Sequence, residues 1–290
     1  MIINEILSIV SEVVLSAYPL LIKLVDASIP MQTGLRMISY TILASIAAIV
    51  TKSPIAPTSI FSPETIFVGL MNLLHVGASY TAFDQLAGGN AMALFYTYPI
   101  WNILGSAYLF KEKIQKASIP WIGLALLGTV LLSQPSLKNW TALGVVAALV
   151  AAITETGIYL WFRTHKESES DQPWTKMIQM YGSSSVFWSI GILCMMLLGS
   201  IAKNTFKVSP TGLAAILAFN TFIGFVGYAL RFYLIPKVST IVFSALSFIG
   251  VFAAYGLGWL FTNEIPNFTQ ILGAIAIIVA NTVLLRRETV

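Results

Sequence analysis

Ten long apolar segments constrain the fold of this chain more than any other feature. Each is about 20 residues long, the length that an α-helix needs to cross the hydrocarbon core of a bilayer, and short polar or proline-containing breaks separate them. Because lipid offers no hydrogen-bond partners to an open backbone, we expect all ten to be membrane helices and the fold to be all-α. The segments are 5–25, 32–51, 63–84, 89–110, 117–134, 140–162, 174–200, 209–234, 238–262 and 267–285.

The composition supports this interpretation. Hydrophobic residues make up 57% of the chain and charged residues only 10%, whereas soluble domains carry about 25% charged residues. The first segment carries Glu5 in place of the basic start of a signal peptide, so we interpret it as the first membrane helix. The net charge of +4 is modest and indicates no nucleic-acid partner.

The chain contains an internal self-match at about half its length. Residues 88–114 form an apolar run with Pro99 in its first half and Glu112 near its end, and residues 239–265 form a looser copy that ends near Glu264 and carries Val251 at the proline position. The two glutamates lie 152 positions apart (264 minus 112), close to half of 290 residues. A tract ending in Thr-Val-Leu-Leu follows each copy. We therefore predict two five-helix repeats, 1–136 and 137–290.

The distribution of lysine and arginine predicts the orientation. The side of the membrane that holds the N-terminus receives 11 of the 16 basic residues, namely Lys52, Lys111, Lys113, Lys116, Arg163, Lys166, Lys176, Arg231, Lys237, Arg286 and Arg287. Cytoplasmic loops are enriched in such residues, so we expect both termini and the 163–173 loop in the cytoplasm, in a plasma (inner) membrane. An odd number of helices per repeat inverts the second repeat, an architecture common in secondary transporters.

Ten helices in two five-helix units, with the fourth helix of each unit closed by a glutamate, resemble the drug/metabolite transporter superfamily, in particular its EamA-type members. The glycine-containing helix after each copy (Gly123 and Gly128, then Gly273) and the cations Lys23 and Arg163 fit the same pattern. The resemblance covers nearly the whole chain. It implies proton-coupled, exchange or facilitated transport of small organic solutes, often their export, through a central cavity walled by helices 1, 3, 4, 6, 8 and 9.

The sequence contains no motif for nucleotide-driven pumping or catalysis. Neither GxxxxGK[ST] nor GxSxG occurs, and the only histidines are His75 and His165. One buried histidine and the single cysteine, Cys194, do not make a metal site. We therefore expect no enzyme activity, no metal and no cofactor.

Two glutamates lie inside apolar helices, Glu12 in the first helix of the first repeat and Glu155 in the first helix of the second. A charged group there costs roughly 2.5–3.5 kcal/mol on insertion scales, so it usually faces a cavity or a partner. We interpret both as cavity carboxylates for a cationic substrate or a coupling proton. The alternative is a neutral carboxyl group hydrogen-bonded between helices.

Other polar and aromatic residues inside the segments are candidate substrate contacts. A proline bends a membrane helix, and aromatic rings beside it are able to stack on an organic solute or hold an ammonium group. The alternatives are a packed histidine and an aromatic belt at the membrane interface. The candidates are Asn72, His75 and Tyr80, then Tyr98, Trp101 and Asn102 around Pro99, and Tyr159, Asn220 and Tyr228.

These residues favour a small solute with an amine, such as an amino acid. An anionic metabolite, such as a sugar phosphate or a nucleotide sugar, would need buried lysine or arginine. The sequence places Lys23, Arg36, Arg231 and Lys237 near helix ends, with Arg231 interpreted as an anchor that reaches back to the interface. A non-transporting membrane scaffold or receptor is the alternative of a different class.

Overall fold

The structure is a computed structural model that describes residues 2–53, 60–86, 88–134, 140–164, 173–202, 204–262 and 267–288. These residues form a helical bundle, and the described part contains no strand beyond a single bridge between Ala27 and Val208. The helices are α1 (Ile2–Leu15), α2 (Tyr18–Leu24), α3 (Ile29–Val50), α4 (Pro63–Gln85), α5 (Gly88–Phe95), α6 (Tyr98–Leu109), α7 (Ile119–Ser133), α8 (Ala142–Thr164), α9 (Trp174–Leu197), α10 (Pro210–Phe219), α11 (Phe225–Leu234), α12 (Thr240–Thr262) and α13 (Phe268–Glu288), with a π-helical turn, Asn220–Gly224, joining α10 to α11.

The prediction of an all-α membrane protein is confirmed. Among the described residues, eight helical segments are long and apolar enough to cross a membrane, and α7 is a shorter apolar helix. The pair α5 and α6 occupies the predicted segment 89–110 and completes the ten. The predicted repeat boundary at 136/137 and Glu264 lie outside the described residues, so the division into repeats stays a prediction.

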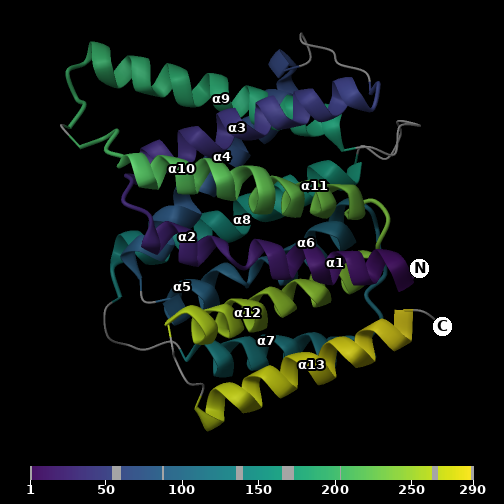
Figure 1. Cartoon of the computed structure of the whole chain (residues 1–290). Helices are drawn as coiled ribbons and strands as arrows, with labels where there is room; N and C mark the ends of the chain where they lie inside the picture. Colours follow the sequence, from purple (N-terminus) through teal and green to yellow (C-terminus); the bar gives the residue numbers. More distant parts are fainter. Residues whose placement is uncertain are drawn as a thin grey trace.

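The ten segments run back and forth, so the two termini lie on the same side of the bundle (Figure 1). The most extensive helix contacts are those of α4 with α8 and α9, α7 with α13, α3 with α9, and α1 with α11 and α12. Each helix has a counterpart at the same position of the other predicted repeat. The counterpart of the α4–α8 pair is the α11–α1 pair. The α3–α9 and α7–α13 pairs each consist of two counterparts. Such packing is expected of a duplicated chain.

Two of the membrane segments are broken at a proline. The α1–α2 break precedes Pro19 and the α5–α6 break precedes Pro99, and in both cases the proline stands in the first turn of the second helix. Proline lacks the backbone N–H and clashes with the preceding turn, so the helix is interrupted there. The π-helical turn interrupts a third segment. Open backbone at this depth is tolerated only inside protein or beside a cavity.

Glycines bring α7 and α13 into contact at their backbones. A Cβ atom added to Gly128 would lie 2.8 Å from the carbonyl oxygen of Gly273, and one added to Gly273 would lie 2.6 Å from that of Gly128. Small residues allow such close approach between membrane helices. The glycines of the predicted motif therefore hold these two helices together at the edge of the bundle.

Two cations that we expected near helix ends are buried inside the bundle, which corrects the sequence interpretation. Arg36 lies in α3 and is 2% exposed, and Arg231 lies in α11 and is 3% exposed. Each is about two helical turns or less from an end of its helix, so position along the chain did not distinguish it from an interfacial anchor. In the orientation prediction, Arg231 is counted on the side of the N-terminus and Arg36 on the opposite side. Leaving both out of the count of basic residues therefore does not change the predicted orientation.

The orientation is tested by cysteine labelling in a Cys194→Ala background. Lys116 and Lys207 are both exposed and lie in connections on opposite sides of the bundle. Because basic residues collect on the cytoplasmic side, we expect Lys116→Cys to react with an impermeant maleimide only in inside-out vesicles and Lys207→Cys only in intact cells. The reverse pattern would overturn the predicted orientation.

Candidate substrate cavity

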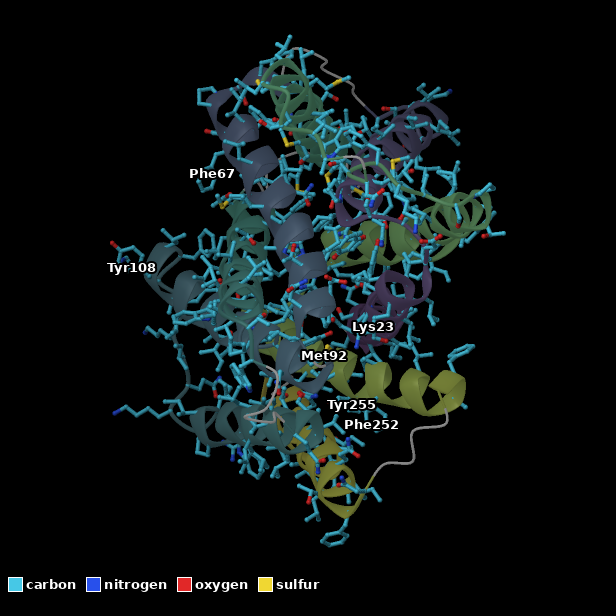
Figure 2. All side chains as sticks on the ribbon, turned by 90° about the vertical axis from the view of Figure 1, so that its left-hand side faces the viewer. Lys23, Phe67, Met92, Tyr108, Phe252 and Tyr255 are labelled. Atoms are coloured by element: carbon cyan, nitrogen blue, oxygen red, sulfur yellow. The ribbon has the colours of Figure 1, made fainter. Side chains whose placement is uncertain are left out.

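A cavity lies at the centre of the bundle, between α1, α2, α3, α4, α5, α8 and α11 and the start of α6. Its lining combines four charged residues and His75 with aromatic and apolar side chains. The cavity has a volume of about 50 Å³, which is smaller than the roughly 300–1,000 Å³ of typical small-molecule sites. Figure 2 shows Met92, one of the lining residues, within the bundle, whereas Phe67 and Tyr108 lie at its periphery.

Arg231 holds both of the predicted cavity carboxylates. One guanidinium nitrogen, Nη1, pairs with Glu12, and the other, Nη2, donates to Glu155 Oε1 at 2.6 Å. Ser247 of α12 adds a hydroxyl bond of 3.2 Å to Glu12. Because the guanidinium is planar with several fixed donors, one arginine is able to serve two carboxylates at once. The three charged side chains are almost wholly buried.

His75 extends this charge network on the far side of Glu155. Its Nδ1 lies 3.1 Å from the carbonyl oxygen of Ala151, and its Nε2 lies 3.4 Å from Glu155 Oε2. A carbonyl oxygen only accepts, so Nδ1 carries a hydrogen and Nε2 of a neutral ring has only a lone pair. A favourable contact between Nε2 and the carboxylate therefore requires one more proton, on either partner. The pair is therefore a position where one proton would be able to bind.

The network joins helices that are far apart in the sequence. Glu12 comes from α1 and Arg231 from α11, which pack together, while His75 comes from α4 and Glu155 from α8, which form the second packed pair. The bond between Arg231 and Glu155 therefore links the two pairs. A buried ion pair adds little net stability, but removal of one partner typically costs about 3–5 kcal/mol because the other charge is left uncompensated.

Arg36 forms a second charged centre in the same cavity. Its guanidinium carbon lies 4.4 Å from the centre of the Tyr228 ring and 4.6 Å from that of Tyr18, with the Tyr40 and Tyr80 rings at 5.6 and 5.9 Å. The Tyr18 and Tyr40 hydroxyls are hydrogen-bonded to each other. We call these four rings the tyrosine cage. Arg36 has no carboxylate partner within the described ranges.

The structure distributes the predicted site residues unevenly. Those that line the cavity are Glu12, His75, Tyr80, Tyr98, Glu155 and Tyr228. Asn72 instead donates a 2.9 Å hydrogen bond to Ser184 of α9, and Tyr159 donates one of 3.0 Å to Thr240 of α12. These two residues join neighbouring helices and are not among the residues lining this cavity.

Three further predicted residues also lie away from the cavity lining. Asn102 and Asn220 are buried, and their side-chain amides find no hydrogen-bond partner in the described part of the chain. Trp101 is 46% exposed on the outer surface of α6. Tyr98, the first residue of the same helix, is 2% exposed and lines the cavity instead.

Sequence reasoning missed Arg36 and Arg231 as cavity residues, and it assigned no role to Tyr18. The sequence contained a signal for Arg231. It is three residues from Tyr228, a predicted cavity residue, and residues at that spacing share a helix face. The predicted wall is also adjusted. Helix 9 of the prediction, α12, supplies Ser247 to the network but no residue to the lining, whereas α3 supplies Arg36.

Comparison with known proteins agrees with this architecture. Residues 2–134 match the EamA-like transporter family. A protein named Pseudopaline exporter CntI from Pseudomonas aeruginosa is 23% identical over 234 residues, covering 78% of this chain and 76% of the relative. An uncharacterized transporter from Helicobacter pylori is 29% identical over 90 residues, 31% of this chain and 26% of that protein. A solved crystal structure has the same fold, with a TM-score of 0.75, 15% identity, and coverage of 97% of this chain and 96% of that one.

The membrane-spanning bundle and the family match indicate a multi-pass integral membrane transporter. The match over residues 2–134 confirms the resemblance of the chain to EamA-type members of the drug/metabolite transporter superfamily.

The charge network predicts a specific pattern of stability. We expect Arg231→Gln to lower the free energy of unfolding by about 3–5 kcal/mol, because two buried carboxylates lose their common partner. Adding Glu12→Gln and Glu155→Gln should recover much of this loss, since no charge is then left unpaired. Thermal unfolding of the purified protein in detergent measures both effects.

The matched control is Lys207→Gln. It breaks the exposed pair between Lys207 and Asp26, and surface pairs contribute about 1 kcal/mol or less. An Arg231→Gln protein as stable as wild type would show that the network does not hold the two helix pairs together.

Proposed function

We propose that this protein is a secondary transporter that exports or exchanges a small organic solute with an amine group, most simply an amino acid or a related amine. The observation that carries the proposal is the buried network of Glu12, Arg231, Glu155 and His75 in a central cavity. Carboxylates at that depth attract a cationic group, and aromatic side chains surround it. The name of the Pseudomonas aeruginosa relative supports the outward direction.

The proposed coupling ion is a proton. Glu155 has two partners, the Arg231 guanidinium and the proton-binding contact with His75. An ammonium group that reaches Glu155 competes with both, because a carboxylate has few acceptor positions. Binding of the amine would then displace the proton, and release of the amine would allow its return. Competition for the Glu155 carboxylate would thus be sufficient to couple proton movement to solute movement.

The same network supplies a means of alternating access. The Arg231–Glu155 bond links the α1–α11 pair to the α4–α8 pair, so its loosening by a proton or an amine would free the two pairs to move against each other. Rocking of one bundle against another is the common mechanism in inverted-repeat transporters. We place the protein in the plasma (inner) membrane with both termini in the cytoplasm, on the distribution of basic residues.

An anionic solute is the second candidate, and one observation favours it. Sequence reasoning set anions aside because the helix interiors lacked basic residues, but Arg36 and Arg231 are both buried in the cavity lining. The carboxylates already occupy Arg231, so only Arg36 is free to attract an anion. This points to a solute that carries both charges rather than to a sugar phosphate or a nucleotide sugar.

The proposal is tested by Glu155→Gln in proteoliposomes. The substitution preserves shape and most hydrogen bonding, but the side chain neither ionises nor releases a proton. We expect the variant to insert and fold, and to lose the dependence of transport on an imposed pH gradient for a panel of labelled amino acids and amines. Glu12→Gln should have a similar but weaker effect, because Glu12 does not contact His75.

Two aromatic residues serve as matched controls in the same assay. Tyr98→Ala removes a ring that lies 5.4 Å from the Arg231 guanidinium carbon and should reduce transport. Trp101→Ala removes an outward-facing ring and should leave transport unchanged. Unaltered transport and pH dependence in Glu155→Gln would leave this glutamate as a structural group and remove the main support for the proposal.

A further inference from the structure

Arg36 is a buried cation whose charge no described carboxylate neutralises. Four tyrosine rings surround it, yet its Nε and Nη2 atoms have no hydrogen-bond partner among the residues of the structure. Rings attract a guanidinium through its flat faces, whereas its N–H bonds point outward in the plane. The tyrosine cage therefore fixes the position of Arg36, while these two donors have no acceptor among the described residues.

Arg231 differs from Arg36 in having carboxylate partners, and this difference indicates what the Arg36 donors would bind. The cavity lining contains two guanidinium groups and two carboxylates, and Arg231 binds both carboxylates. Buried charges in a membrane protein are normally paired or functional. The described cavity residues therefore provide no anion to pair with Arg36. An anion that comes from outside has to be small enough to enter between the rings.

We propose that Arg36 and the tyrosine cage bind a carboxylate group of the transported solute. This rests on the proposed function and narrows it, because the solute is then an amino acid or a similar zwitterion rather than a simple amine. A carboxylate is planar and accepts two parallel bonds from the guanidinium edge. Its single negative charge also matches the single positive charge of Arg36, which a doubly charged phosphate would exceed.

The two centres line one cavity. Tyr228, whose ring contacts Arg36, and Arg231, which holds the carboxylates, are three residues apart in α11 and share one face of that helix. A zwitterion in this cavity would place its carboxylate at the cage and its amine at the network. Phe83, Met92 and Phe95 line the same cavity and offer an apolar wall for a side chain.

The test compares binding of matched probes to the purified full-length protein by isothermal titration calorimetry. The probes are L-phenylalanine and L-methionine, 2-phenylethylamine, which lacks the carboxylate, 3-phenylpropionate, which lacks the amine, and phenyl phosphate. We expect Arg36→Gln to weaken binding of the carboxylate probes at least about tenfold, because their charge-assisted bonds are lost, and to change binding of the amine less than about threefold.

Two controls separate binding from folding. Arg36→Lys keeps the charge but loses the planar fork, so the carboxylate probes should bind with intermediate affinity. Lys23→Gln, an exposed cation at the end of α2, should change nothing. Without a probe, Arg36→Gln should still unfold in one cooperative transition, at a temperature lowered only by the loss of its contacts with the four rings. A lower melting temperature with an equal loss for every probe would make Arg36 a structural residue and overturn the proposal.

The remaining outcomes distinguish this inference from the proposed function. Wild-type protein that binds no carboxylate probe overturns the carboxylate site, even if proteoliposomes still transport the amine. Tighter Arg36-dependent binding of phenyl phosphate than of 3-phenylpropionate also overturns it, in favour of a phosphate. Arg36-dependent binding of carboxylates without transport of any probe retains the site and rejects the proposed function.

Discussion

The bond pair that Arg231 makes with Glu12 and Glu155 is the interaction on which the rest of the bundle interior depends. Three charges at this depth are tolerable only because they pair and hydrogen-bond with one another. The interaction also joins the α1–α11 pair to the α4–α8 pair, so it ties the charge balance of the cavity to helix packing. Because an unpaired charge is costly at this depth, a proton or an ammonium group that reaches Glu155 would disturb the bonds of Arg231 strongly.

The helix breaks make room for this interaction. The α1–α2 and α5–α6 interruptions, set by Pro19 and Pro99, both face the central cavity, where Pro19, Tyr96 and Tyr98 line it. At the outer edge the helices instead pack closely, because glycines bring α7 and α13 into backbone contact. Local chemistry therefore separates a tightly packed rim from an open, polar centre within one helical bundle.

Much of the candidate site was accessible from the sequence, and the reason is the apolar background. Glu12, Glu155 and His75 stood out because a polar group within a membrane segment has few acceptable positions. Trp101 and Asn72 stood out equally, yet the structure directs one outward and the other to a neighbouring helix. Polarity identifies a residue that needs a partner, but it does not say whether that partner is a cavity or an adjacent helix.

The sequence by itself determined that the chain is all-α and membrane-embedded, because a bilayer leaves long apolar segments little choice but to form helices. It also determined the ten segments and the proline, Pro99, that breaks one of them. Only the tertiary structure decided which charges meet. Arg231 lies 219 residues from Glu12 and 76 from Glu155, and no local pattern encodes a contact at that separation. For the same reason only the structure revealed that Arg36 has four tyrosine rings around it and, within the part of the chain that the structure describes, no carboxylate partner.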